Sequence, residues 1–133
     1  MASYFRPLNL SVLPGGYAVL RFAQDAGIPS WATRGEFFSV TRSEEELSVV
    51  CPQENLPVGE RAEKEWRVLK VHGPFSFDEI GVLASLVQPL ANKQVSVLAI
   101  STFDTDYLLA QSDGLQKAIL TLRDAGHRIV EAK

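Results

Sequence analysis

The second half of the chain restricts its fold most, because short β-forming runs alternate there with two amphipathic helical segments. Trp66–His72 alternates apolar and polar side chains, as a half-buried strand does. A helix is expected from Phe77, and Pro89 should kink or tighten its last turn. Its apolar residues share one face because they recur at helical spacing: Ile80, Leu83, Val87 and Leu90.

Two more strands and a second helix complete this pattern. The strands are expected at Val95–Ile100 and Tyr107–Ala110, with a turn over Ser101–Thr105. Ser112 is a suitable N-cap for the second helix, and Gly126 is placed to end it. That helix presents a buried stripe of Leu115, Ala118, Ile119 and Leu122. With a last strand at His127–Val130, the order β-α-β-β-α-β predicts a ferredoxin-like domain: a four-stranded antiparallel sheet with both helices on one face.

The first half is expected to consist mainly of strands. Four runs rich in β-branched and aromatic residues are bounded by turn formers: Leu8–Leu13, Tyr17–Phe22, Phe37–Thr41 and Leu47–Cys51. Between them Gln24–Gly35 contains two glycines and a proline, which argues against a long helix. Trp31, within that segment, is expected to fill a small core. The polar stretch Pro57–Lys64 separates the halves, so the expected domains are residues 1–60 and 61–133.

Composition excludes several classes of function. A net charge of −3 and a pI near 5.4 give no electrostatic reason to expect nucleic acid. No uninterrupted apolar run is long enough to span a membrane, and the N-terminus lacks the pattern of a signal peptide. The single cysteine, Cys51, cannot form an intrachain disulfide and is expected to be buried and inert. We therefore expect a cytoplasmic protein.

Neither a metal nor a cofactor is expected. His72 and His127 are far apart in sequence and accompany no other residues at metal-ligand spacing, so both are expected to be partly exposed histidines at strand ends. Gly15-Gly16 is read as a turn, because no lysine or serine follows at the spacing of a phosphate-binding loop.

The stretch FDEIGVLASLVQPLANKQVSVLAISTFDTDYLLAQ, residues 77–111, resembles the ACT domains of the aspartate kinase regulatory region and, more closely, those of the cytosolic arginine sensors. The match lies in DEIG at the helix start, Ser96-Val97 in the next strand and STFDTD at the hairpin. Upstream, GEFFSVTR at residues 35–42 resembles the sensors' divergent ACT repeat. The resemblance implies an α+β protein of two tandem ACT-like, ferredoxin-like domains, the first divergent or truncated.

In that family an amino acid binds where two ACT domains meet side by side. The resemblance implies that Ser96 and Val97 approach the ligand from a neighbouring subunit of a homodimer. The ligand-binding residues that it implies are Glu79, Ile80, Gly81, Ser96, Val97, Thr102, Phe103 and Asp106.

Each of these residues also has a structural interpretation. Ser76-Phe77-Asp78-Glu79 has the spacing of a capping box, in which Glu79 satisfies the helix start. Gly81 would let a ligand approach the backbone closely, or serve tight packing. Aspartate is an ordinary turn residue, and of the two at the hairpin Asp106 is the better anchor for a ligand amine, whereas Asp104 is expected to be solvated.

The leading hypothesis is a regulatory protein, not an enzyme, that binds a free amino acid at an ACT–ACT interface and acts allosterically on an unknown protein partner. A stand-alone protein-interaction module with a vestigial pocket is the alternative. A small enzyme that uses Cys51 or the pair Glu79 and Asp106 is a third hypothesis.

Overall fold

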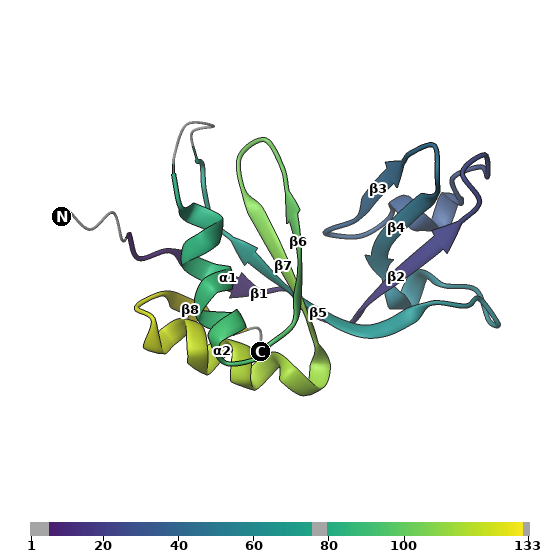
Figure 1. The fold of residues 1–133 in the computed structure, drawn as a ribbon. Helices are drawn as coiled ribbons and strands as arrows, with labels where there is room; N and C mark the ends of the chain where they lie inside the picture. Colours follow the sequence, from purple (N-terminus) through teal and green to yellow (C-terminus); the bar gives the residue numbers. More distant parts are fainter. Residues whose placement is uncertain (1–5, 76–79, 132–133) are drawn as a thin grey trace. The chain divides into compact units, whose positions relative to one another are not determined.

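The computed structural model describes residues 6–75 and 80–131 and divides into two compact units (Figure 1). One unit combines Met1–Pro14 with Arg67–Lys133, and the other is Gly15–Trp66. We call them the split unit and the inner unit. The boundary between them falls within β5 (Glu63–Val71). These units differ from the expected division at residue 60, because the first strand is part of the same unit as the C-terminal half.

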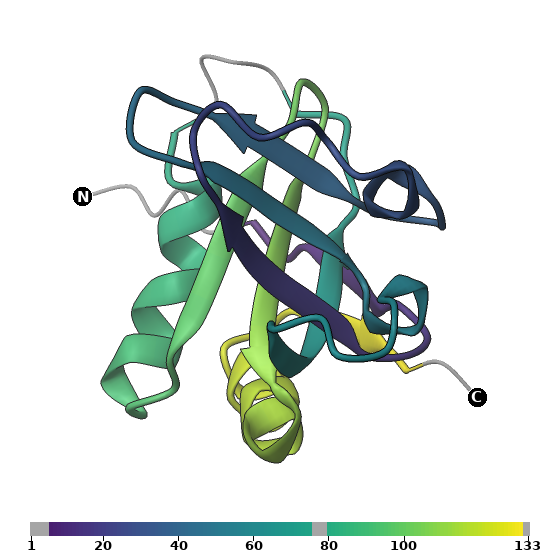
Figure 2. The same cartoon turned by 90° about the vertical axis from the view of Figure 1, so that its right-hand side faces the viewer.

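The inner unit is built from antiparallel strands. Its sheet has the order β3-β4-β2, and β2 also pairs with the start of β5, through Tyr17 opposite Trp66 and Val19 opposite Glu63 (Figure 2). The three strands are β2 (Tyr17–Phe22), β3 (Ser39–Arg42) and β4 (Leu47–Pro52). Its helical elements are two 3-10 turns, η1 (Ser30–Thr33) and η2 (Gln53–Asn55). The expectation of no long helix in Gln24–Gly35 is confirmed.

A small apolar cluster stabilises the inner unit. Its buried members are Ala18, Leu20, Ala32, Leu47, Val49 and Cys51. Trp31 packs against this cluster as expected, with its ring centroid 6.3 Å from that of Phe22.

The split unit confirms the expected β-α-β-β-α-β order from β5 onward. Its elements are β1 (Asn9–Val12), the C-terminal part of β5, α1 (Val82–Asn92), β6 (Val97–Ser101), β7 (Asp106–Gln111), the 3-10 turn η3 (Ser112–Gly114), α2 (Leu115–Asp124) and β8 (Arg128–Val130). Ser112 begins η3 and Gly114 is the N-cap of α2, so the expected cap at Ser112 is wrong. Gly126, with a φ of 102°, follows α2 as expected.

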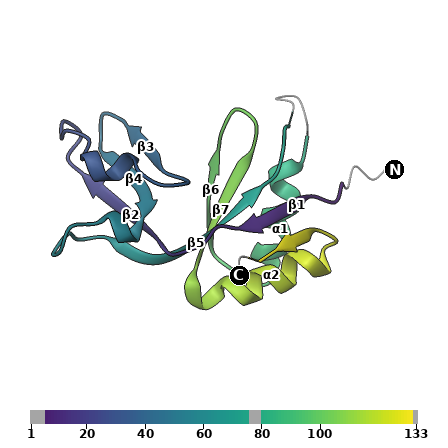
Figure 3. The same cartoon turned by 180° about the vertical axis from the view of Figure 1, so that it is seen from behind.

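The sheet of the split unit has one more strand than the order alone predicts. β1 lies between β5 and β8, so the strand order is β6-β7-β5-β1-β8 (Figure 3). It pairs antiparallel with β5, where Leu10 faces Val71, and parallel with β8, where Leu10 faces Ile129. The expected four-stranded antiparallel sheet is therefore a five-stranded mixed sheet. Local alternation indicates a strand, but it does not indicate which strand will be its neighbour.

The start of α1 also differs from the expectation. The helix begins at Val82, and Gly81 at its N-cap has a left-handed backbone with a φ of 82°. A residue in that conformation cannot continue a right-handed helix, so the expected start at Phe77 and the place of Ile80 on the buried face are wrong. Ile80 is 88% exposed, and Leu86 and Leu90 are the fully buried residues of α1. The capping box at residues 76–79 lies outside the described residues.

Both helices pack on one core. The expected stripe of α2 is buried, and it joins Leu86 and Leu90 of α1 with side chains of β1, β5, β7 and β8 in a single cluster. None of the helices in the described part of the chain has the length and apolar character that a bilayer crossing requires.

Two adjacent residues of α2 provide a test of this core. Ile119 is fully buried, whereas Leu120 is 58% exposed. We expect Ile119→Ala to lower the free energy of unfolding by about 2–5 kcal/mol, because it leaves a cavity. Leu120→Ala should change it by less than about 0.5 kcal/mol. Urea denaturation of both variants measures the difference, and equal effects would contradict the assigned helix face.

Candidate functional site

The hairpin formed by β6 and β7 is closed by a tight turn. Ser101 and Asp106 face each other in register at its base. Across the turn, the N–H of Thr102 donates to the carbonyl of Thr105 at 2.9 Å, and the N–H of Thr105 donates to Thr102 Oγ1 at 3.2 Å. These two bonds close the turn locally, as threonine side chains often do in turns.

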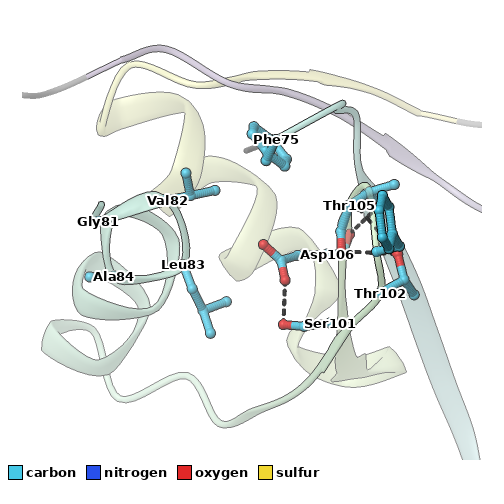
Figure 4. A pocket seen from close by; sticks show the side chains of 10 residues that line it. Phe75, Gly81, Val82, Leu83, Ala84, Ser101, Thr102, Thr105 and Asp106 are labelled. Carbon is cyan, nitrogen blue, oxygen red and sulfur yellow. Dashed lines mark hydrogen bonds between the residues drawn. The ribbon is translucent and has the colours of Figure 1, made fainter. Parts of the chain in front are cut away.

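Asp106 is held at the base of this turn. Its Oδ1 accepts a hydrogen bond from Ser101 Oγ, while among the described residues no hydrogen bond reaches its Oδ2. The side chain is half-buried and points into the space between the hairpin and α1 (Figure 4). Asp104, two residues earlier, is exposed, as expected. Of the two aspartates, only Asp106 can act on a molecule between the hairpin and α1.

The N-terminus of α1 lies opposite this hairpin. No side chain among the described residues caps it, although the carbonyl of Gly81 accepts from the N–H of Ser85 at 2.9 Å. The first backbone N–H groups of a helix have no partner within the helix and carry the positive end of its dipole. This end of α1 therefore presents hydrogen-bond donors to an anionic group.

A hollow of about 360 Å³ lies between the start of α1 and the hairpin (Figure 4). Its walls combine apolar side chains with the polar residues of the turn. Among the described lining residues Asp106 carries the only formal charge. The full lining is Phe75, Gly81, Val82, Leu83, Ala84, Ser101, Thr102, Phe103, Thr105 and Asp106.

The segment that follows β5 forms a further wall of the hollow and is packed tightly against the hairpin. The N–H of Phe75 donates to the carbonyl of Asp104 at 3.0 Å, and a Cβ at Gly73 would lie only 2.1 Å from the same oxygen. Because that neighbour is backbone, no side chain fits at position 73 unless the hairpin moves. Outside the lining, the guanidinium of Arg6 lies 5.3 Å from the centroid of the Phe75 ring.

The structure brings together four of the eight expected ligand-binding residues: Gly81, Thr102, Phe103 and Asp106. Ile80 is next to them in sequence but is not part of the lining, and Glu79 lies outside the described residues. Ser96 lines a separate, smaller hollow near η3, and Val97 packs against the core cluster. That separation agrees with their expected place in a neighbouring subunit but does not test it.

Sequence reasoning missed six lining residues: Phe75, Val82, Leu83, Ala84, Ser101 and Thr105. Ser101 could have been found, because it is placed symmetrically with Asp106 about the turn. Phe75 gave no local signal, since it reaches the hollow through the hydrogen bond of its backbone to Asp104.

A larger hollow, of about 660 Å³, is formed in the inner unit. Its lining contains charged side chains of both signs, four of them exposed, with no helix N-terminus beside them: Arg21, Glu46, Glu60, Arg61, Glu63 and Lys64. This hollow lacks the helix N-terminus and the facing carboxylate that line the hollow between α1 and the hairpin. The hollow beside α1 is therefore the candidate site.

The groups that could support other chemistry are elsewhere. Cys51 is buried in the core of the inner unit, and desolvation raises the pKa of its thiol from 9.0 to about 11. In the described part of the chain, no three His, Cys, Asp or Glu side chains gather as a metal site would require.

Models of protein families match both halves of the chain. Residues 61–124 match the family model described as the ACT domain, and residues 15–59 match a model of an N-terminal domain. The cytosolic arginine sensor for mTORC1 subunit 1 of Rattus norvegicus is 35% identical over 100 residues, which cover 68% of this chain. The chain spans only 18% to 30% of the length of such sensors.

Solved structures extend the likeness to the whole chain. A protein of Agrobacterium tumefaciens is 36% identical, covers 97% of this chain and 96% of its own, and has a TM-score of 0.90. The regulatory subunit of aspartate kinase from Thermus thermophilus, at 12% identity, covers 88% of this chain and 96% of its own, with a TM-score of 0.62. At that identity the second likeness concerns the fold alone.

The burial of Cys51 predicts an unreactive thiol. Only the thiolate reacts, and a pKa raised by two units leaves roughly a hundredfold less thiolate at pH 8. We expect iodoacetamide to alkylate the native protein at least about 100-fold more slowly than the urea-unfolded chain. Mass spectrometry of timed samples gives both rates. Similar rates in the two states would restore Cys51 as a candidate nucleophile.

Proposed function

The chain belongs to the ACT domain family, and we propose that it is a regulatory protein that binds a free amino acid in the hollow between α1 and the hairpin. One observation carries the proposal. A helix N-terminus that no side chain of the described residues caps and the half-buried carboxylate of Asp106 line the same small hollow. Every free amino acid carries a carboxylate and an ammonium group close together, so these two ends match its constant part.

The carboxylate of the ligand is assigned to the start of α1. The N–H groups there favour an anion, both through hydrogen bonds and through the helix dipole. Gly81 has no side chain to shield them, and no atom of the described residues other than its chain neighbours lies within 4 Å of the position that its Cβ would occupy. A ligand can therefore approach this backbone closely.

The ammonium group is assigned to Asp106. Ser101 Oγ donates to Asp106 Oδ1. This hydrogen bond fixes the rotation of the Asp106 carboxylate and leaves its Oδ2 for the ligand. Charge-assisted hydrogen bonds of this kind are about twice as strong as neutral ones. The ligand side chain would then contact the apolar wall, which includes Phe75, Leu83 and Phe103. The volume of the hollow, at the lower end of the range for ligand pockets, suits a molecule of amino-acid size.

We propose that a second copy of the chain completes the site. In the described sheet of the split unit β6 pairs with β7 alone, so it forms an edge that another chain can cover. A two-fold dimer is the commonest closed assembly and would let Ser96 and Val97 of the partner reach the ligand. Glu79 and Ile80 remain proposed ligand contacts.

The regulatory role follows by analogy with named relatives. One relative is named a cytosolic arginine sensor, and one structural neighbour is named a regulatory subunit of aspartate kinase. We extend to this chain a cytoplasmic location and an allosteric effect on a protein partner. An interaction module with a vestigial pocket is the second candidate, and the exposed Phe103 and Ile80 beside the hollow favour it.

The proposed assembly predicts a dimer. Sedimentation velocity at tens of micromolar should give a single species of twice the chain mass, because the edge of β6 would be covered. A monomer at all concentrations, with or without the twenty amino acids, would contradict both the dimer and the shared site.

The proposed site predicts different effects for its two aspartates. At about 100 times its dissociation constant, an amino acid should stabilise the protein by about 2.7 kcal/mol. Asp106→Asn should reduce this gain to less than about 1 kcal/mol at the same ligand concentration, because losing a buried charge partner costs about 2–5 kcal/mol of binding. Asp104→Asn should change affinity less than about threefold.

Thermal unfolding with each of the twenty amino acids, followed by calorimetric titration of those that bind, makes the measurement. The unliganded Asp106→Asn protein should melt close to wild type, because the amide oxygen can still accept from Ser101. A full ligand effect in both variants would refute the assignment to Asp106. If no amino acid binds the wild type, the interaction module becomes the better description.

A further inference from the structure

Pro89 leaves a gap in the hydrogen bonding of α1. In an α-helix the carbonyl of each residue accepts from the N–H four residues later, so Ser85 should be paired with residue 89. Residue 89 is proline, which has no N–H. The carbonyl of Ser85 therefore needs a donor from outside the helix, since an unpaired polar group away from water is costly.

His127 supplies that donor. Its Nε2 lies 3.1 Å from the Ser85 carbonyl oxygen, and its side chain belongs to a residue that is only 3% exposed. The expectation of a partly exposed histidine at this position is therefore wrong. Two segments 42 residues apart in the sequence meet in this contact.

A second hydrogen bond decides which nitrogen carries the proton. The backbone N–H of Leu8 points to His127 Nδ1 at 3.1 Å. An N–H can only donate, so Nδ1 must hold a lone pair, and the proton of the neutral ring is on Nε2. Nε2 then donates to Ser85. Together the two bonds require one tautomer of the neutral imidazole.

The backbone of His127 adds further connections. Its N–H donates to the carbonyl of Leu122 at the end of α2 at 3.0 Å, and the next residue, Arg128, donates to the carbonyl of Leu8 at 2.9 Å. One residue therefore connects α1, α2 and the start of the β1–β8 pair. Ser85, whose carbonyl it holds, directly follows residues 81–84 of α1, which line the hollow.

We infer that His127 is a positioning residue. It provides the hydrogen bond that Pro89 denies to Ser85, and so fixes α1, next to the residues that line the hollow, against Leu8, which directly precedes β1. The consequence for ligand binding rests on the proposed function. The structural link between His127 and Pro89 does not, and it is tested without any ligand.

A double-mutant cycle on the full chain tests the link. The variants are His127→Phe, Pro89→Ala and the two together, compared by urea unfolding. His127→Phe removes the acceptor of the Leu8 N–H in the wild-type and in the Pro89→Ala background alike, so the energy of that hydrogen bond cancels in the cycle. In the Pro89→Ala background residue 89 regains an N–H for Ser85, so His127→Phe should reduce the folding equilibrium constant about tenfold less there, a coupling of about 1.4 kcal/mol. His72→Phe, at the exposed histidine, is the matched control and should show no coupling with residue 89.

Amide hydrogen exchange separates positioning from general packing. His127→Phe should accelerate exchange at the Ser85 and Leu86 amides of α1 while leaving the Ile119 amide of α2 within about twofold of wild type, and Pro89→Ala should restore the slow exchange. Equal acceleration in both helices, or no restoration, would overturn the inference.

The wild-type protein offers a test that does not depend on how the variants fold. Long-range nitrogen–proton correlation spectra at neutral pH should show His127 as the Nε2–H tautomer with a slowly exchanging ring proton. His72, on the surface, should show fast exchange. An Nδ1–H or a charged ring at His127, or coupling below twofold in the cycle, would refute the proposed role. Failure of the amino-acid titrations alone would leave it intact.

Discussion

The pairing of β1 with both β5 and β8 is the constraint on which the rest of the split unit depends. Leu10 pairs with Val71 on one side and with Ile129 on the other, and Ile129 is more than a hundred residues away in the sequence. The strand closes the core beneath both helices. It also brings Leu8 to His127 and fixes the end of β5, from which Gly73 and Phe75 reach the hairpin.

The candidate site is a consequence of this framework more than of any single motif. The turn of the hairpin is held by its own threonines, and the start of α1 is set by the left-handed backbone of Gly81. Neither element forms a hollow alone. They face each other because α1 packs through Leu86 and Leu90 on the core that the hairpin strand β7 shares. The polarity of the hollow, with N–H donors on one side and a carboxylate on the other, follows from that packing.

Pro89 illustrates how a local cost is balanced by a distant residue. A proline inside a helix removes a hydrogen bond and is unfavourable by roughly 3 kcal/mol in isolation. Here the carbonyl that it leaves unpaired lies against the imidazole of His127, so the helix retains its course next to the site. The same contact requires the neutral histidine to adopt one tautomer.

The sequence by itself determined the order of the elements, the buried stripe of α2, the hairpin with Asp106 on its inner side, and the family resemblance. These features are local, because helical and strand periodicities and turn residues are written within a few positions of one another. Only the tertiary structure decided where β1 inserts, that α1 begins after Gly81, that Phe75 lines the hollow and that His127 is buried. The start of α1 depends on the backbone conformation of Gly81, and the other three depend on hydrogen bonds or packing between segments far apart in the chain. Such pairings leave no periodic trace in the sequence, since many strands could satisfy the same edge.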